Sequence, residues 1–280
     1  MGDSGTAASG GLVVRVGARV AAAISGFGDF WRFAGRTFEW LGRTLTARKT
    51  WRLVLPECME IGVRSVPVIL ITGSFVGMVL AVQTLEQFRS VGLEDQMGAV
   101  VSLSVVRELG PVLAGVMIAG RIGGALTAEL GTMNVTEQLD ALRSMGTDPI
   151  GYLVVPRFWA CLLLAPVLTL YCNLLGTLGG WFVAVVLQGV DGGPYWEYTR
   201  NAVDNFDLFS GLFKSFFFGG IIGLISCYKG FTCRPGAEGV GRACTEAFVS
   251  SFVAILAMDF FLAVFLQAIQ MWLYGFRPFL

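Results

Sequence analysis

Five long, mostly apolar stretches are the feature that most constrains how this 280-residue chain can fold. An α-helix needs about 20 such residues to cross the roughly 30 Å hydrocarbon core of a bilayer. We predict membrane spans at 65–85, 98–120, 153–187, 208–228 and 244–272. Only 14% of the residues are charged, whereas about 25% is typical of soluble chains. The pattern therefore predicts an all-α, multi-pass membrane protein.

The basic residues indicate how the five spans are oriented. Fifteen Lys and Arg residues lie in the segments 1–64, 121–157 and 228–243, and only three lie in 86–97, 188–207 and 273–280. Loops on the cytoplasmic side of membrane proteins are enriched in Lys and Arg. The asymmetry predicts a cytoplasmic N-terminus and a C-terminus on the outer side.

The segment before the first span is predicted to lie along the membrane surface. In residues 27–52, aromatic and aliphatic side chains recur every three or four positions, and Arg32, Arg36 and Arg43 occupy the opposite face. A basic amphipathic helix rich in Trp and Phe lies in the interface rather than across the bilayer. We therefore expect an interfacial helix at 27–52, preceded by a flexible tail at 1–26.

A short amphipathic helix is predicted at 134–146, between the second and third spans. Asn134 and Glu137 have the spacing of a capping box, and Gly146 is a typical helix end. With about 11 residues the helix would be roughly 16 Å long, too short to cross the membrane. Its apolar face contains Leu139 and Leu142, and its polar side contains Glu137, Asp140 and Arg143. The spacing fits docking into a partner's groove and fits equally a helix that rests on the membrane or on its own bundle.

Ionisable residues inside the predicted spans are the sharpest functional signal. Arg107 and Glu108 lie within the second span, where a charge costs roughly 2.5–3.5 kcal/mol to insert at the helix centre. Neighbours on a helix point about 100° apart, so each needs its own partner or a polar cavity. Two interpretations stay open: a salt-bridge network between helices, and a cavity that receives a charged headgroup.

Two further charges lie in the fourth and fifth spans. Lys214 is expected to extend toward the outer membrane surface, because its predicted position is near the end of its span. Asp259 lies in mid-span and is expected to pair with a polar group on a neighbouring helix.

The residue types present argue against several kinds of site. The chain contains no His, and its six Cys residues show no CxxC spacing, so we predict neither a catalytic residue nor a metal site. The net charge is zero and gives no indication of nucleic-acid binding. The G-x-x-x-x-G-K-[ST] phosphate loop is absent. If ATP drives transport, ATP and its Mg²⁺ would therefore bind to a separate ATPase.

A series of short motifs runs from the second span to the fifth. The motifs are RELGPV at 107–112, AGR at 119–121, TAELG at 127–131, TEQLDAL at 136–142, DP at 148–149, PRFWA at 156–160, NAVD at 201–204 and LAMDF at 256–260. Together they resemble the MlaE/YrbE permeases, the membrane subunits of MCE-associated ABC lipid transporters. The resemblance implies a single permease domain at 27–280 that forms a homodimer.

The resemblance also implies a function. Such a permease would move phospholipids or related lipids between the inner membrane, most often of a bacterium, and a periplasmic MCE protein. A separate cytoplasmic ABC ATPase would supply the energy, and some members also bind a STAS-domain protein. By position, the helix at 134–146 would couple to the ATPase, with Glu137, Leu139, Asp140, Leu142 and Arg143 as the candidate coupling residues. Arg107 and Glu108 would lie near the lipid headgroup.

Two alternatives remain at this stage. One is a permease for a small polar solute. The other is a membrane enzyme that uses Glu108 or Asp259 as an acid or base, although the lack of His and of a nucleophile–base pair counts against it.

Overall fold

The computed structural model describes residues 6–44, 48–90 and 92–274, and within these ranges the chain forms helices and turns without strands. The chain divides into two units, residues 1–47 and 48–280. The first contains one helix, α1 (Thr6–Thr44). Residues 6–26, predicted to be part of a tail, continue this helix, because Ala, Val and Arg in this stretch are compatible with helix formation. The end predicted at residue 52 is also wrong, since Arg48 already begins α2.

The second unit contains five helical segments that are long and apolar enough to cross a membrane. They run over Trp51–Arg89, Glu94–Val135, Ile150–Leu187, Asn205–Phe231 and Ala237–Trp272. Each contains one of the five predicted spans, so the prediction of an all-α, five-span protein is confirmed. Each segment is longer than its prediction, because the helices continue beyond the purely apolar residues.

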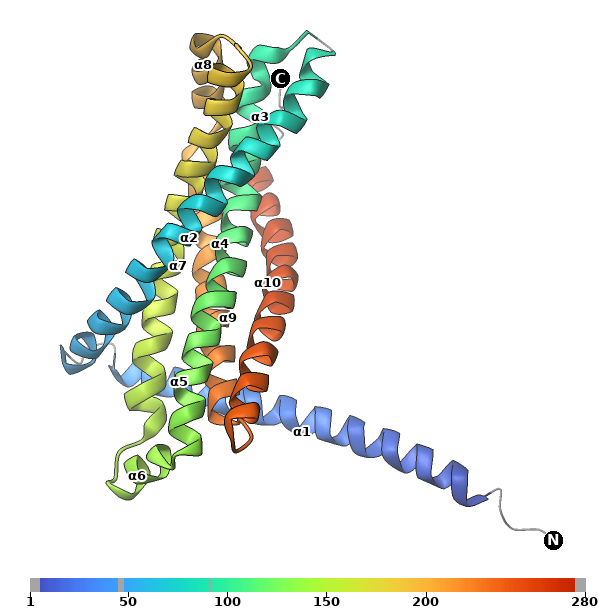
Figure 1. The fold of residues 1–280 in the computed structure, drawn as a ribbon, viewed down its shortest axis with the longest axis vertical. Helices are drawn as coiled ribbons and strands as arrows, with labels where there is room; N and C mark the ends of the chain where they lie inside the picture. Colours follow the sequence, from blue (N-terminus) through green and yellow to red (C-terminus); the bar gives the residue numbers. More distant parts are fainter. Residues whose placement is uncertain (1–5, 45–47, 91, 275–280) are drawn as a thin grey trace. The chain divides into compact units, whose positions relative to one another are not determined.

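The helices of this unit make up the five segments, and the two short helices α6 and α8 lie between segments (Figure 1). They are α2 (Arg48–Arg89), α3 (Met97–Ser104), α4 (Gly110–Ile118), α5 (Gly124–Val135), α6 (Gln138–Ser144), α7 (Val155–Trp181), α8 (Gly192–Ala202), α9 (Asn205–Phe231) and α10 (Ala237–Tyr274). Between α3 and α4 lies the π-helical segment η2 (Val105–Leu109), and η3 (Ala119–Gly123) lies between α4 and α5. The second span is therefore one long helix with two wider turns.

Helix α7 packs against α2 along one side and against α9 along another. Glycines allow these helices to approach closely: a Cβ atom on Gly77 of α2 would lie 1.8 Å from the Gly176 carbonyl oxygen of α7. A Cβ on Gly219 of α9 would lie 2.4 Å from the carbonyl oxygen of Cys161. Small residues four positions apart serve this purpose in membrane helices.

Two short helices lie at opposite ends of the second unit, α6 at one and α8 at the other (Figure 1). We call these the α6 end and the α8 end. Asp191 caps α8 by accepting a hydrogen bond from the Gly193 N–H at 2.9 Å. Of the aromatic residues of α8, Trp196 is exposed but Tyr195 is fully buried. Tyr195 is therefore a core residue, and its burial raises the pKa of its hydroxyl to about 12.

Candidate functional site

The π-helical segment η2 contains Arg107 and Glu108, and the sequence explains its geometry. Pro111 has no N–H, so the carbonyl of Arg107 lacks the usual helical donor. The N–H of Gly110 instead donates to the carbonyl of Val105, five residues earlier. Wide turns of this kind occur frequently at functional sites. The two charged residues thus occupy a local distortion of the second span.

Arg107 binds the start of α9 and the far part of α10. Its guanidinium lies 2.5 Å from Oδ1 of Asp207, and its Nη2 donates to Oε1 of Gln270 at 3.2 Å. The other carboxylate oxygen of Asp207 accepts the backbone N–H of Asp204 at 2.9 Å, as part of a capping box. Asp207 is buried, so Arg107 neutralises a carboxylate that also caps a helix.

Glu108 belongs to a second group of charges. The ammonium of Lys214 lies 2.5 Å from Oε2 of Glu108 and 3.1 Å from Oδ1 of Asp259. The Lys214 side chain is only 2% exposed, so the prediction that it extends to the membrane surface is wrong. Two carboxylates hold the ammonium inside the bundle, because a buried charge requires a paired neighbour. The expectation that Asp259 pairs with a neighbouring helix is confirmed.

The structure thus gives Arg107 and Glu108, both on η2, separate partners on α9 and α10. The interhelical network that the sequence left open is present, and the sequence did not identify Asp207 or Gln270 as members of it. A signal for Asp207 exists in the stretch Asp204–Asn205–Phe206–Asp207, which has the three-residue spacing of a capping box before an apolar run.

A third group of charges lies toward the α6 end and was not predicted. The guanidinium of Arg157 on α7 contacts Oε1 of Glu129 on α5 at 2.6 Å and Oε1 of Glu57 on α2 at 3.3 Å. Its Nη1 also donates to the carbonyl of Leu153 at 3.0 Å. Arg157 is buried. One side chain therefore ties three long helices together beside a polar cavity of about 360 Å³ that Arg121 also lines.

Helix α6 contains most of the residues predicted to couple to an ATPase, but it is shorter than predicted. Glu137 precedes it with a positive φ of 61°, and its side chain does not cap the helix. Asn134 belongs to α5, where its Nδ2 contacts the carbonyl of Cys233 at 3.5 Å. The predicted capping box is therefore wrong, because the left-handed turn at Glu137 separates α5 from α6.

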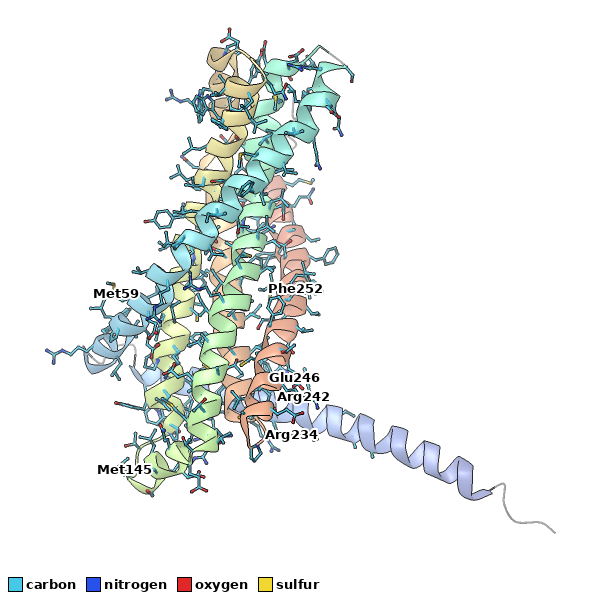
Figure 2. All side chains as sticks on the ribbon, in the orientation of Figure 1. Met59, Met145, Arg234, Arg242, Glu246 and Phe252 are labelled. Atoms are coloured by element: carbon cyan, nitrogen blue, oxygen red, sulfur yellow. The ribbon has the colours of Figure 1, made fainter. Side chains whose placement is uncertain are left out.

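The two faces of α6 differ as its sequence pattern indicates. Leu139 is buried, whereas Leu142 is partly exposed. Asp140 and Arg143 are exposed and form an ion pair of 2.7 Å. Met145 follows the helix and is 69% exposed at the α6 end (Figure 2). Glu137 is exposed too, so this end presents charged and apolar groups to its surroundings.

Comparison with known proteins identifies the fold described above. The model of a permease family, described as Permease MlaE, matches residues 54–265, which include all the charge groups of the bundle. The chain belongs to the MlaE permease family.

Individual relatives extend this result. An intermembrane phospholipid transport system permease protein MlaE of Haemophilus influenzae is 38% identical over 239 residues, which are 84% of this chain and 92% of that protein. A probable ABC transporter permease protein of Rickettsia felis is 44% identical over 74% of this chain and 80% of its own length. The chloroplastic protein TRIGALACTOSYLDIACYLGLYCEROL 1 of Arabidopsis thaliana is 40% identical over 80% of this chain and 64% of its own.

These relatives confirm the resemblance seen in the sequence motifs. This member of the MlaE family is an ABC transporter permease and a multi-pass membrane protein. The prediction of a transport subunit rather than an enzyme is likewise confirmed, because the relatives are named as permeases.

Proposed function

We propose that this MlaE-family permease moves phospholipids or related lipids between a bacterial inner membrane and a periplasmic MCE protein. The observation that supports this most is the 38% identity, over 84% of the chain, to a permease named for intermembrane phospholipid transport. ATP and its Mg²⁺ bind to a separate ABC ATPase, and a STAS-domain protein is a further candidate partner. The α6 end faces the cytoplasm and the α8 end faces the periplasm.

Arg107 and Glu108 are the candidate contacts for the lipid headgroup. Arg107 is 24% exposed although its partner Asp207 is buried, and Glu108 is 50% exposed although its partner Lys214 is buried. Each therefore has a buried anchor and a side that another group can reach. A guanidinium forms strong, charge-assisted hydrogen bonds with phosphate, and a carboxylate accepts hydrogen bonds from a headgroup amine or hydroxyl.

The permease acts as a homodimer in this proposal. The most apolar part of the fifth span is only 17% buried within one chain, compared with 67% for the third. Phe260, Phe261 and Phe265 of α10 are all more than half exposed. A second copy covers part of this apolar surface, and the lipid pocket forms between the two copies.

Coupling to the ATPase runs through α6 in this proposal. The exposed groups Glu137, Asp140 and Arg143 contact the ATPase, and Leu139 and Leu142 hold α6 against its own chain. Helix α5 leads directly into α6 and contains Glu129, which contacts Arg157 on α7. A displacement of α6 on ATP binding therefore reaches α7 through one helix and one ion pair.

Co-purification with the ATPase tests the coupling assignment. The double variant Glu137→Lys with Asp140→Lys reverses two exposed charges and should abolish ATPase association. The matched control is Glu86→Lys with Glu197→Lys, which reverses two exposed charges outside α6 and should leave association intact. Normal assembly and ATP hydrolysis in the α6 variant would exclude α6 as the coupling element.

Mass spectrometry of the purified complex tests the substrate class separately. Bound phospholipid supports lipid transport. A complex that contains no lipid and transports a small polar solute contradicts lipid transport. The assignment of α6 as the coupling element would stand in that case, because it does not depend on the substrate.

A further inference from the structure

An apolar cavity on the outside of the bundle is not part of the charge groups described above. It has a volume of about 530 Å³ and lies among α7, α8, α9 and η2. Leu170, Leu174 and Leu178 of α7 form one wall, and Trp196 of α8 and Leu208 of α9 contribute others. A volume of this size is within the range of about 300–1,000 Å³ that is usual for small-molecule sites.

One polar side chain in this lining has no partner. Asn173 of α7 is 4% exposed, and neither its amide oxygen nor its amide nitrogen has a hydrogen-bond partner among the residues the structure describes. Other buried polar groups of the described residues are unpaired as well, but among them only Asn173 lines the cavity. A buried polar group without a partner costs about 1–3 kcal/mol, so the amide calls for a ligand that supplies one.

The position of Asn173 depends on a glycine in the RELGPV motif. A Cβ atom on Gly110 would lie 1.7 Å from Oδ1 of Asn173. Any larger residue at 110 would displace the amide from its present place. Gly110 therefore leaves space for the Asn173 amide, although this amide makes no hydrogen bond to any described residue.

The surroundings of the cavity indicate what enters it. Leu170, Leu174 and Leu178 recur every four residues on a membrane span and are 40–56% exposed, so the cavity opens toward hydrocarbon. Among the residues that the structure describes, the lining contains no charged one. The nearest charges in sequence, Arg107 and Asp207, adjoin the lining residues Val106 and Leu208 but do not line the cavity themselves. A charged headgroup therefore meets no oppositely charged side chain in the cavity, whereas an acyl chain meets apolar side chains on its walls.

The amide adds a more specific requirement. Its Nδ2 needs an acceptor, and the ester carbonyl where an acyl chain joins glycerol is such an acceptor. Trp196 is 41% exposed at the cavity, and tryptophans of this kind mark the boundary between hydrocarbon and headgroups. We propose that the cavity binds one acyl chain of a glycerolipid from the surrounding bilayer, with Asn173 donating to its ester carbonyl. This site is separate from the transport pocket and does not depend on the proposed function.

Lipid retention tests the site without ATPase or transport. The purified chain is reconstituted with palmitoyl-oleoyl phosphatidylethanolamine or with its diether analogue, which lacks the ester carbonyls. Native mass spectrometry then measures the lipid retained per chain. The unaltered chain should retain the ester lipid about fivefold better, as expected for one neutral hydrogen bond. Equal retention of both lipids would overturn the role of Asn173.

Substitutions locate the effect. Asn173→Leu should retain the two lipids equally, and Leu174→Trp should fill the cavity and reduce retention of both. Leu163→Trp, on an exposed position of α7 outside the cavity, is the matched control and should change neither. If Leu174→Trp instead disrupts self-association of the chain, the cavity belongs to an interface between copies and the lipid proposal is wrong. The ester–ether comparison on the unaltered chain needs no substitution, so a variant that fails to fold does not remove the test.

Discussion

Two buried cations in this MlaE-family permease have similar partners and different surroundings. Lys214 lies between the carboxylates of Glu108 and Asp259. Arg157 lies between those of Glu57 and Glu129 toward the α6 end. We call these the Lys214 triad and the Arg157 triad. Each joins three helical elements, but only the Lys214 triad includes a π-helical turn.

The choice of cation explains the difference between the triads. Arg157 has a planar fork of donors and uses it on two carboxylates and on the carbonyl of Leu153. Lys214 is a compact charge on a flexible stem, whose contacts can be rearranged at lower cost. The Arg157 triad therefore suits a fixed junction, and the Lys214 triad suits a site whose partners exchange with a ligand.

The largest effect is expected at the Arg157 triad. Arg157→Met removes the shared cation and leaves Glu57 and Glu129 without a partner, which should cost about 3–5 kcal/mol of stability. Arg157→Lys should recover only part of this, because an ammonium cannot reproduce the fork. Thermal unfolding in detergent measures both.

The matched control for this prediction is Arg64→Met. Arg64 pairs with Glu60 at 2.7 Å, but both side chains are more than 60% exposed, and exposed pairs contribute about 0–1 kcal/mol. Equal unfolding temperatures for Arg157→Met and Arg64→Met would show that the Arg157 triad is not a structural junction.

The sequence predicted the number and kind of spans because hydrocarbon imposes length and apolarity on each helix separately. It also predicted that Arg107 and Glu108 face different partners, which follows from helix geometry alone. It failed for Lys214 and Arg157, which a hydropathy pattern places near span ends but which lie buried against other helices. Their partners lie between 28 and 106 residues away in the sequence, and only the packing of the helices shows which groups meet.

A smaller effect, on lipid rather than on folding, is expected at Arg107. Arg107→Ala should reduce co-purified phospholipid about tenfold, the loss of one charge-assisted hydrogen bond of roughly 1.5 kcal/mol. The same change leaves the buried Asp207 unpaired, so stability also falls. The double variant Arg107→Ala with Asp207→Asn removes that penalty. If the double variant is stable and retains normal lipid, Arg107 serves the fold alone.

The smallest effect on stability is expected at the ion pair of α6. Asp140 and Arg143 are each at least 60% exposed, so Arg143→Ala should change stability by no more than about 0.5 kcal/mol. Its consequence should appear only when the ATPase is present, as weaker binding of the ATPase to the permease. Arg242→Ala, which removes an exposed ion pair on α10, is the control and should alter neither quantity. If Arg143→Ala instead lowers stability without weakening ATPase binding, α6 supports the fold, as the Arg157 triad does. A contact that the fold requires is not free to bind the ATPase, so the coupling assignment would then be wrong.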